Sequence, residues 1–360
     1  MNSKKSILIK IFLLSLISIS IISINSTIVA SPADTQTVNT KTRRELLTDF
    51  IKKLKTEDGF RNSLEDANIT LESTYYGIVI SDFLQIEYST YDIIYMIQSL
   101  QQPNYGFANT KNTNASLSAT YYAVRSLVRL GVSSETLQRW KIFNFINSTI
   151  APVLYNTTNY SKLTVEDLDN ICEFLEMSVL LNVTVVFPYN TLISSLKAFQ
   201  YTNGTYQSFN IAISNIKLLN LLNQKPDDVA GAINFVKAFR FNETGFASDR
   251  TDNITITDTY DAIQVLQILG SEIGAKQRIV DSILKFQHND GGFSEIEKSV
   301  TNNLKSTYYA YLILLELNAI GQLDQLAFLA STGYLPGFTF GTVISLILLL
   351  GAIAYKRKNR

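Results

Sequence analysis

Two kinds of apolar segment alternate along the middle of the chain. The first kind is amphipathic: residues 280–287 carry apolar side chains at helical spacing, with polar ones between them. The second kind is apolar on nearly every side, as in residues 308–317. A helix that is apolar all round must be buried on most sides. The pattern therefore predicts helix pairs, with the amphipathic member outside and the apolar member inside.

A short motif marks the turn within each helix pair. The amphipathic segment ends at Gly-Phe, and a Thr-Tyr pair follows thirteen or fourteen residues later, where the apolar segment begins. Gly tolerates the positive φ of a helix end, and Ser or Thr can cap the start of a helix. The motif occurs four times: Gly59-Phe60 with Thr74, Gly106-Phe107 with Thr120, Gly245-Phe246 with Thr259, and Gly292-Phe293 with Thr307.

The spacing of the phenylalanines indicates six units. Phe60 and Phe107 are 47 residues apart, as are Phe246 and Phe293, whereas Phe107 and Phe246 are separated by 139 residues, close to three more steps. Two weaker units should therefore lie between them. One is visible in the segment that ends with Gln200, Gly204 and Tyr206, and the other is expected to pass through Tyr155.

A second repeated position supports this count. The residue six places before the aromatic is Leu54, Gln101, Gln200, Arg240 or Gln287 in the five clearer units. Self-similarity at such a period is typical of repeat architectures, and closing the array removes the exposed ends of an open solenoid. The sequence predicts an all-α fold, an (α/α)6 toroid over residues 42–325.

The N-terminus has the features of an export signal. Residues 1–30 combine early lysines with a long apolar run and small residues near Ala30, which is typical of a signal peptide. An uncleaved membrane anchor is the alternative, because the apolar run is long for a signal. Residues 31–41 are polar and are expected to form a linker.

The C-terminus has the features of a membrane anchor. After a linker over residues 326–338, residues 339–355 are apolar or small, which is just enough to cross a bilayer core, and residues 356–360 form a basic tail. A buried core helix is the alternative. The positive-inside rule places the tail in the cytoplasm and the toroid outside the cell. The membrane is therefore an expected partner.

Composition narrows the functional classes. The chain has 31 basic and 31 acidic residues and, apart from the short C-terminal tail, no basic stretch, so no nucleic-acid partner is expected. Nine Asn-X-Ser/Thr acceptors lie within the expected mature part of the chain and fit an exported, glycosylated surface: Asn68, Asn114, Asn147, Asn156, Asn159, Asn182, Asn203, Asn242 and Asn253. Cys172 is the only cysteine, so it forms no intrachain disulfide and is expected to be a small buried side chain.

The motif also carries a family resemblance. The Gln-X-X-X-Gly-Gly-Phe segment at residues 287–293, followed by Ser-Thr-Tyr-Tyr-Ala at residues 306–310, resembles the repeat of protein prenyltransferase β subunits and squalene/terpene cyclases. The resemblance covers most of residues 45–325 and implies a toroid with a central cavity opened by the N-termini of the inner helices. The Pro-Gly-Phe of residues 336–338, with the span and tail that follow, is similar to the sorting tails of archaeal surface proteins.

The catalytic motifs of those families do not carry over. Prenyltransferases bind zinc through an Asp-X-Cys and a later His, but the matching positions here hold Asp258, Tyr260 and the region of Ser306. With one Cys and one His in the chain, a closed Cys/His zinc site cannot be built. Neither a metal nor another cofactor is expected. The Asp-X-Asp-Asp acid of the cyclases has only a partial counterpart in Asp258 and Asp261.

Candidate site residues are expected at the rim of the cavity. Asp258 and Asp261 lie one turn apart at the start of an inner helix. We favour a helix cap with a favourable charge at the positive helix end. A carboxylate pair for acid/base work or a cation site is the alternative. The other candidates are the acids Glu72, Asp290 and Glu295, and the repeated tyrosines Tyr76, Tyr122 and Tyr309, for which packing is the simpler role and ligand binding the alternative.

Two functional hypotheses remain. The first is a membrane-anchored binding or structural domain outside the cell, with an extracellular glycan, lipid or protein as its ligand. The second is an extracytoplasmic enzyme that uses rim carboxylates on a glycan or terpenoid, although fold resemblance does not determine chemistry. Carboxylates that converge in a deep cleft would favour the enzyme, and a cavity filled by side chains would favour a scaffold.

Overall fold

The computed structural model describes residues 41–155, 160–249 and 253–327. The predicted signal peptide, the C-terminal span and the basic tail lie outside these residues, as do Asn156 and Asn159. Among the helices of these three ranges, none is long and apolar enough to cross a bilayer.

Helices of two kinds alternate through the described part of the chain, as the hydrophobic pattern predicts. The outer helices are α2 (Arg43–Leu54), α4 (Thr90–Ser99), α7 (Ile142–Leu154, preceded by the short α6, Ser134–Arg139), α9 (Tyr189–Lys197), α11 (Val229–Lys237) and α13 (Lys276–Leu284). The inner helices are α3 (Leu71–Leu84), α5 (Leu117–Arg129), α8 (Val165–Leu180), α10 (Phe209–Leu221), α12 (Ile256–Ile268) and α14 (Leu304–Glu316).

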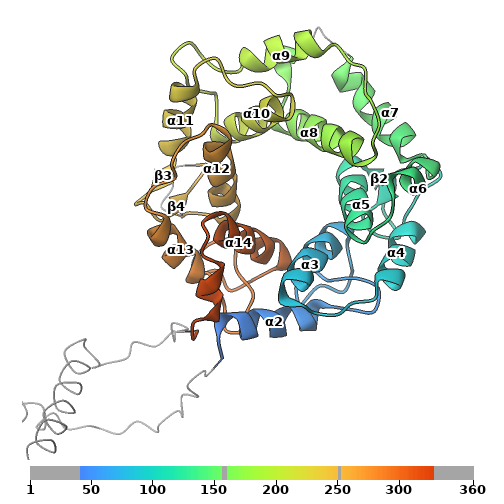
Figure 1. Ribbon diagram of the computed structural model, residues 1–360, viewed down its shortest axis with the longest axis vertical. Helices are drawn as coiled ribbons and strands as arrows, with labels where there is room; N and C mark the ends of the chain where they lie inside the picture. Colours follow the sequence, from blue (N-terminus) through green and yellow to red (C-terminus); the bar gives the residue numbers. More distant parts are fainter. Residues whose placement is uncertain (1–40, 156–159, 250–252, 328–360) are drawn as a thin grey trace, which may run out of the picture. The chain divides into compact units, whose positions relative to one another are not determined.

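The inner helices form a closed ring (Figure 1). Each packs against the next in the order α3, α5, α8, α10, α12 and α14, and α14 packs back against α3. Each outer helix lies against its own inner partner. The prediction of six pairs that close into a toroid is therefore confirmed within residues 41–327.

The ends of the ring are joined by backbone hydrogen bonds. The N–H of Arg43 donates to the carbonyl of Gln325 at 3.0 Å, just after the short 3-10 helix η2 (Ile320–Asp324), and the N–H of Ala327 donates to Lys41 at 3.2 Å. The N–H of Leu304, at the start of α14, donates to the carbonyl of Asn62 in the α2–α3 loop. The first and last units are therefore in direct contact, in the same way as units that are consecutive in the chain.

The Gly-Phe and Thr-Tyr motifs are two halves of one local structure. Each motif Thr is fully buried, and its hydroxyl accepts a hydrogen bond from the N–H of the motif Phe. The pairs are Phe60 with Thr74 (3.3 Å) and Phe107 with Thr120, Phe246 with Thr259, and Phe293 with Thr307 (3.0 Å each). A buried backbone donor must be satisfied, which explains why the Thr recurs.

The expectation that the motif Thr starts the helix is wrong. The inner helices begin three residues earlier, and their caps are Thr70, Ser116, Thr164, Ser208, Thr255 and Asn303, each accepting from a first-turn N–H. Both positions favour Ser or Thr, one for capping and one for the loop, and this made them hard to separate in the sequence.

The residue six places before the aromatic links neighbouring units. The amide nitrogens of Gln101, Gln200 and Gln287 each donate to a carbonyl in their own loop at 3.1 Å. Each also donates to a carbonyl at the start of the next outer helix, respectively Trp140, Asp228 and Arg43, at 2.9, 2.7 and 3.0 Å. Arg240 makes the equivalent link through its guanidinium to Ile273 and Gly274.

Small β ladders and one irregular loop complete the connections between outer and inner helices. Strands β1 (Phe107–Ala108) and β2 (Ala115–Ser116) pair antiparallel, as do β3 (Arg240–Phe241) and β4 (Gly245–Phe246).

The third unit is the α7–α8 pair. Tyr155 ends α7 and is 44% exposed, so the buried aromatic of this loop is Tyr160, in the 3-10 turn η1 (Tyr160–Lys162), whose hydroxyl donates to the carbonyl of Leu154.

Candidate functional site

The inner helices enclose a cavity of about 640 Å³. Its walls are polar on one side and aromatic on the other. Six tyrosines line it, together with five carboxylic acids and two cations. These are Tyr76, Tyr121, Tyr122, Tyr260, Tyr308 and Tyr309; Asp169, Glu173, Glu176, Asp258 and Asp261; and Arg125 and Lys217. The volume lies in the range of small-molecule sites.

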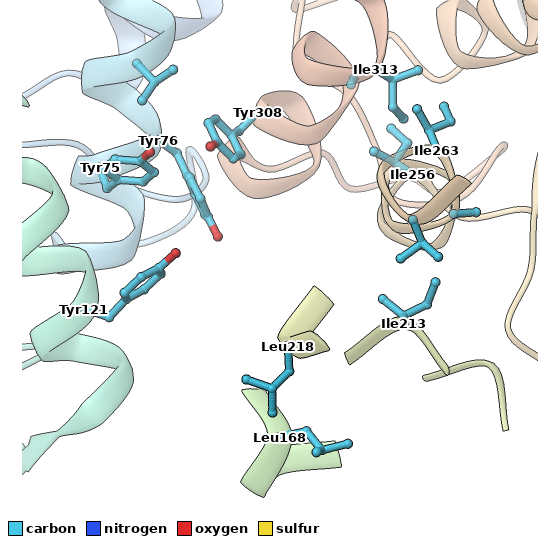
Figure 2. Packing of buried hydrophobic residues seen from close by; sticks show 14 of the residues in the cluster. Tyr75, Tyr76, Tyr121, Leu168, Ile213, Leu218, Ile256, Ile263, Tyr308 and Ile313 are labelled. Carbon is cyan, nitrogen blue, oxygen red and sulfur yellow. The ribbon is translucent and has the colours of Figure 1, made fainter. Parts of the chain in front are cut away.

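The tyrosines form a continuous wall on α3, α5, α12 and α14. Tyr76 stacks on Tyr308 with ring centroids 4.4 Å apart, and it meets Tyr122 edge to face at 5.5 Å. Tyr309 connects this group to Tyr260 at 5.1 Å. Figure 2 shows the core tyrosines on α3, α5 and α14, whereas the labelled core residues of α8, α10 and α12 are leucine and isoleucine. The wall arises because the Thr-Tyr motif recurs at the same level of neighbouring helices.

Hydrogen bonds hold part of this wall in place. The hydroxyl of Tyr76 donates to Oε1 of Glu72 at 2.9 Å and lies 2.8 Å from the hydroxyl of Tyr122. Glu72 also lies 3.4 Å from Nζ of Lys305, on α14. Burial raises the pKa of Tyr76 and Tyr122 far above the ordinary range, and it raises the pKa of Tyr309 to about 12. These phenols are therefore neutral hydrogen-bonding groups at any physiological pH.

Three acids on α8 face the tyrosine wall across the cavity. Asp169, Glu173 and Glu176 are spaced four and three residues apart, which puts them on one side of a helix. Burial, followed by the charges of Asp169 and Glu176, raises the pKa of Glu173 to about 7. Its Oε2 is buried without a hydrogen-bond partner. Asp169 is exposed at the cavity, and desolvation by the surrounding protein raises its pKa.

Arg125 lies among the tyrosines at the α5 side of the cavity. Its guanidinium stacks 4.5 Å above the ring of Tyr75 and 5.1 Å above that of Tyr121. Its Nη1 donates to the hydroxyl of Tyr121 at 2.6 Å, and that hydroxyl donates to Glu176 at 2.5 Å. Arg125 therefore connects the aromatic wall to the acidic face of α8.

The two acids of α12 predicted from the sequence both line the cavity. Asp261 forms an ion pair with Lys217 of α10, with 2.6 Å between Oδ1 and Nζ. Asp258 accepts a hydrogen bond from the N–H of Ser248 at 2.9 Å. The cap of α12 is Thr255, not Asp258, which lies in the first turn and whose own N–H bonds to the Thr255 hydroxyl. Each carboxylate is thus tied to a neighbour.

The remaining predicted residues lie away from the cavity lining. Glu295 accepts from the N–H of Thr257 and the hydroxyl of Ser306 at 2.9 and 2.8 Å, so it joins the starts of α12 and α14. Asp290 accepts from the N–H of Gly292 and the amide of Asn302, and it orders its own loop. Glu72 does not line the cavity itself, but it accepts hydrogen bonds from Tyr76 and Tyr122, which do. It lies in a second, polar pocket at the start of α3.

The residues present do not fit the zinc of the resembled prenyltransferases. Tyr260 lies where a thiolate would be needed, and burial raises the pKa of its phenol above the ordinary range. Cys172 lines the cavity from α8, but burial raises the pKa of its thiol and keeps it a thiol. Within the residues that the structure describes, no three His, Cys, Asp or Glu side chains are placed to hold a metal ion.

The residues that sequence reasoning missed belong mainly to α8 and α5. Asp169, Glu173, Glu176 and Arg125 were not candidates. The available signal is the run of acids at helical spacing within residues 165–180, which the structure shows to be the inner helix α8. This unit has no Gly-Phe motif to fix its register, so its sequence does not show which side of the helix faces the cavity.

Comparisons with known proteins agree with the architecture. Residues 86–153 and 187–335 match the prenyltransferase alpha-alpha toroid domain. A protein geranylgeranyltransferase-I from Candida albicans, complexed with GGPP, shares the fold with a TM-score of 0.57 and 16% identity, over 71% of this chain and 86% of that one. A type II terpene cyclase, MstE from Scytonema, has a TM-score of 0.51 and 12% identity, over 78% and 97%. No curated protein matches the chain.

The family match covers more than half of the chain, so this protein belongs to the prenyltransferase alpha-alpha toroid family. At 12–16% identity, the two solved structures establish the fold and leave the chemistry of the cavity to its own residues.

Proposed function

We propose that this toroid is a ligand-binding domain held at the outer surface of a membrane, and that its central cavity receives a small organic molecule. The observation that carries the proposal is the cavity itself. It has a volume of about 640 Å³ and is lined by six tyrosines opposite a set of carboxylic acids. A toroid with a purely structural role would gain stability by filling this space with apolar side chains.

The placement outside the membrane rests on the sequence. It is supported by the signal-like N-terminus, by the C-terminal apolar span with its basic tail, and by the acceptor asparagines. Six acceptor asparagines in the described ranges are exposed, as glycosylation requires: Asn68, Asn114, Asn182, Asn203, Asn242 and Asn253. Asn147 is partly buried.

The binding proposal is tested by blocking the cavity. Gln264 lines it from α12, so Gln264→Trp should fill part of the space, whereas Gln277→Trp on the exposed side of α13 should not. The full chain in detergent is screened by thermal shift against amines, sugars and prenyl alcohols. We expect at least one class to stabilise the wild type and Gln277→Trp but not Gln264→Trp. If no class distinguishes the blocked variant, the cavity is not a binding site.

Glu173 supports a second candidate, an acid-catalysing enzyme acting on a glycan or terpenoid. A buried carboxyl with a pKa of about 7 is half protonated at neutral pH, which suits a general acid. Its Oε2 faces no protein partner and could donate a proton to a bound substrate. The test is product formation from prenyl alcohols and oligosaccharides, followed by mass spectrometry. Turnover that Glu173→Gln leaves unchanged would remove this candidate.

A further inference from the structure

We propose, building on the ligand-binding function above, that the central cavity selects a small organic cation, an ammonium group bound between the tyrosine wall and the acids of α8. The inference goes beyond the family and the fold, because it rests on the charges and ring faces of this particular cavity.

The lining of the cavity carries more acidic than basic side chains. Five carboxylic acids face two cations. Lys217 is paired with Asp261, and Arg125 is engaged by Tyr121 and, through it, by Glu176. Among the described residues, Glu173 forms no ion pair, and its Oε2 has no hydrogen-bond partner. A ligand that carries positive charge would supply the missing partner.

The tyrosine wall already holds one cation, the side chain of Arg125. The guanidinium of Arg125 lies over the faces of Tyr75 and Tyr121. The face of an aromatic ring is negative and attracts cations, most strongly where water is excluded. The wall continues past Arg125 through Tyr122, Tyr309 and Tyr260, which all line the cavity. A second cation can therefore bind by the same chemistry.

The tyrosine wall and the acids of α8 lie next to each other. Glu173 lies on α8 and Tyr122 on α5, and these two helices pack against each other. Both residues line the same space. An ammonium group placed there would touch a carboxylate on one side and a ring on the other. An anionic ligand such as a diphosphate would instead be repelled by the acidic lining.

The test compares two probes of the same shape. Choline carries a quaternary ammonium, and 3,3-dimethyl-1-butanol is its uncharged analogue. Isothermal titration is carried out on the full chain in detergent at pH 8, above the pKa of Glu173. We expect choline to bind at least about tenfold more tightly than the alcohol, because only choline gains the charge interactions. This comparison uses the wild type and does not depend on any variant folding.

Two variants test whether Glu173 is responsible for the preference for choline. Glu173→Gln keeps the shape of the side chain and should weaken choline binding at least about tenfold while leaving the alcohol unchanged. Glu166→Gln is the matched control, because Glu166 is exposed on the same helix and does not line the cavity. Its affinity for choline should equal that of the wild type.

The outcomes separate this inference from the binding proposal. Equal affinity for choline and the alcohol, with both lost in Gln264→Trp, overturns the selection for cations but keeps the cavity as a binding site. Tighter binding of pyrophosphate than of choline also overturns it. So does a choline affinity that Glu173→Gln leaves unchanged. Failure of both probes overturns the inference, while the wider ligand screen decides the binding proposal independently.

Discussion

The buried carboxyl of Glu173 should make the stability of the toroid depend on pH in a specific direction. Burial, then the charges of Asp169 and Glu176, raises its pKa from 4.5 to about 7. In the unfolded chain the same group is in water and loses its proton near its ordinary pKa. Replacing it by Gln keeps the shape and removes the ionisation, so Glu173→Gln tests the reasoning directly.

The sign follows from proton binding. Between pH 4.5 and about 7, folded Glu173 keeps its proton while the unfolded chain has lost it. The unfolded state then binds fewer protons, so the free energy of unfolding falls as the pH rises. The cost is absent below the unfolded pKa and complete above the folded one. At about 1.4 kcal/mol per pH unit, the interval from 4.5 to about 7 amounts to ~3 kcal/mol.

The assay is urea denaturation of the wild type and Glu173→Gln at pH 4.5 and pH 8.5. We expect the variant to gain ~3 kcal/mol more stability, relative to wild type, at pH 8.5 than at pH 4.5. Glu166→Gln, on the exposed side of the same helix, should change stability by only a few tenths of a kcal/mol at either pH.

Two results would refute the reasoning. If Glu173→Gln changes stability equally at both pH values, folding does not shift the pKa of Glu173. If the variant loses stability at pH 8.5, the carboxylate has a stabilising partner. Either result would also weaken the acid-catalyst candidate, because that role needs the raised pKa.

Four further outcomes are expected. Thr307→Val should cost ~1–3 kcal/mol in chemical denaturation, because it leaves a buried loop N–H without its acceptor, whereas exposed Thr301→Val should cost little. Gly77→Ala should lower the melting temperature, because its Cβ would collide with the ring of Phe60, whereas Gly321→Ala meets no neighbouring atom. Protease added to intact cells should remove the toroid, and complete protection would contradict the proposed topology. Elemental analysis of the purified chain should find less than stoichiometric zinc, and zinc that survives dialysis would reopen the question of a metal site.

Local repeats made the fold accessible from the sequence. The hydrogen bond between Thr307 and Phe293 joins residues only fourteen positions apart, and it recurs in the other units with the same motif. Contacts between near neighbours in the chain leave a spacing that can be counted, and the six units that it indicates can close into a ring. The irregular unit shows the limit: without Gly-Phe, the repeat spacing indicates Tyr155, whereas the buried aromatic is Tyr160.

The chain by itself therefore determined the helix pairs, their number, and which helix of each pair is buried. The cavity was decided by tertiary structure. An inner helix that is apolar on nearly every side, such as α14, has no polar stripe to show which side faces the centre. The acids of α8 do form a stripe, but whether that stripe and Arg125 of α5 face the cavity depends on how each helix is rotated against its neighbours. Asp290 and Glu295 show the same limit, because their positions in the motif did not reveal that they order loops. A site assembled from six inner helices exists only once the ring closes, since its charges and rings meet through space and not along the chain.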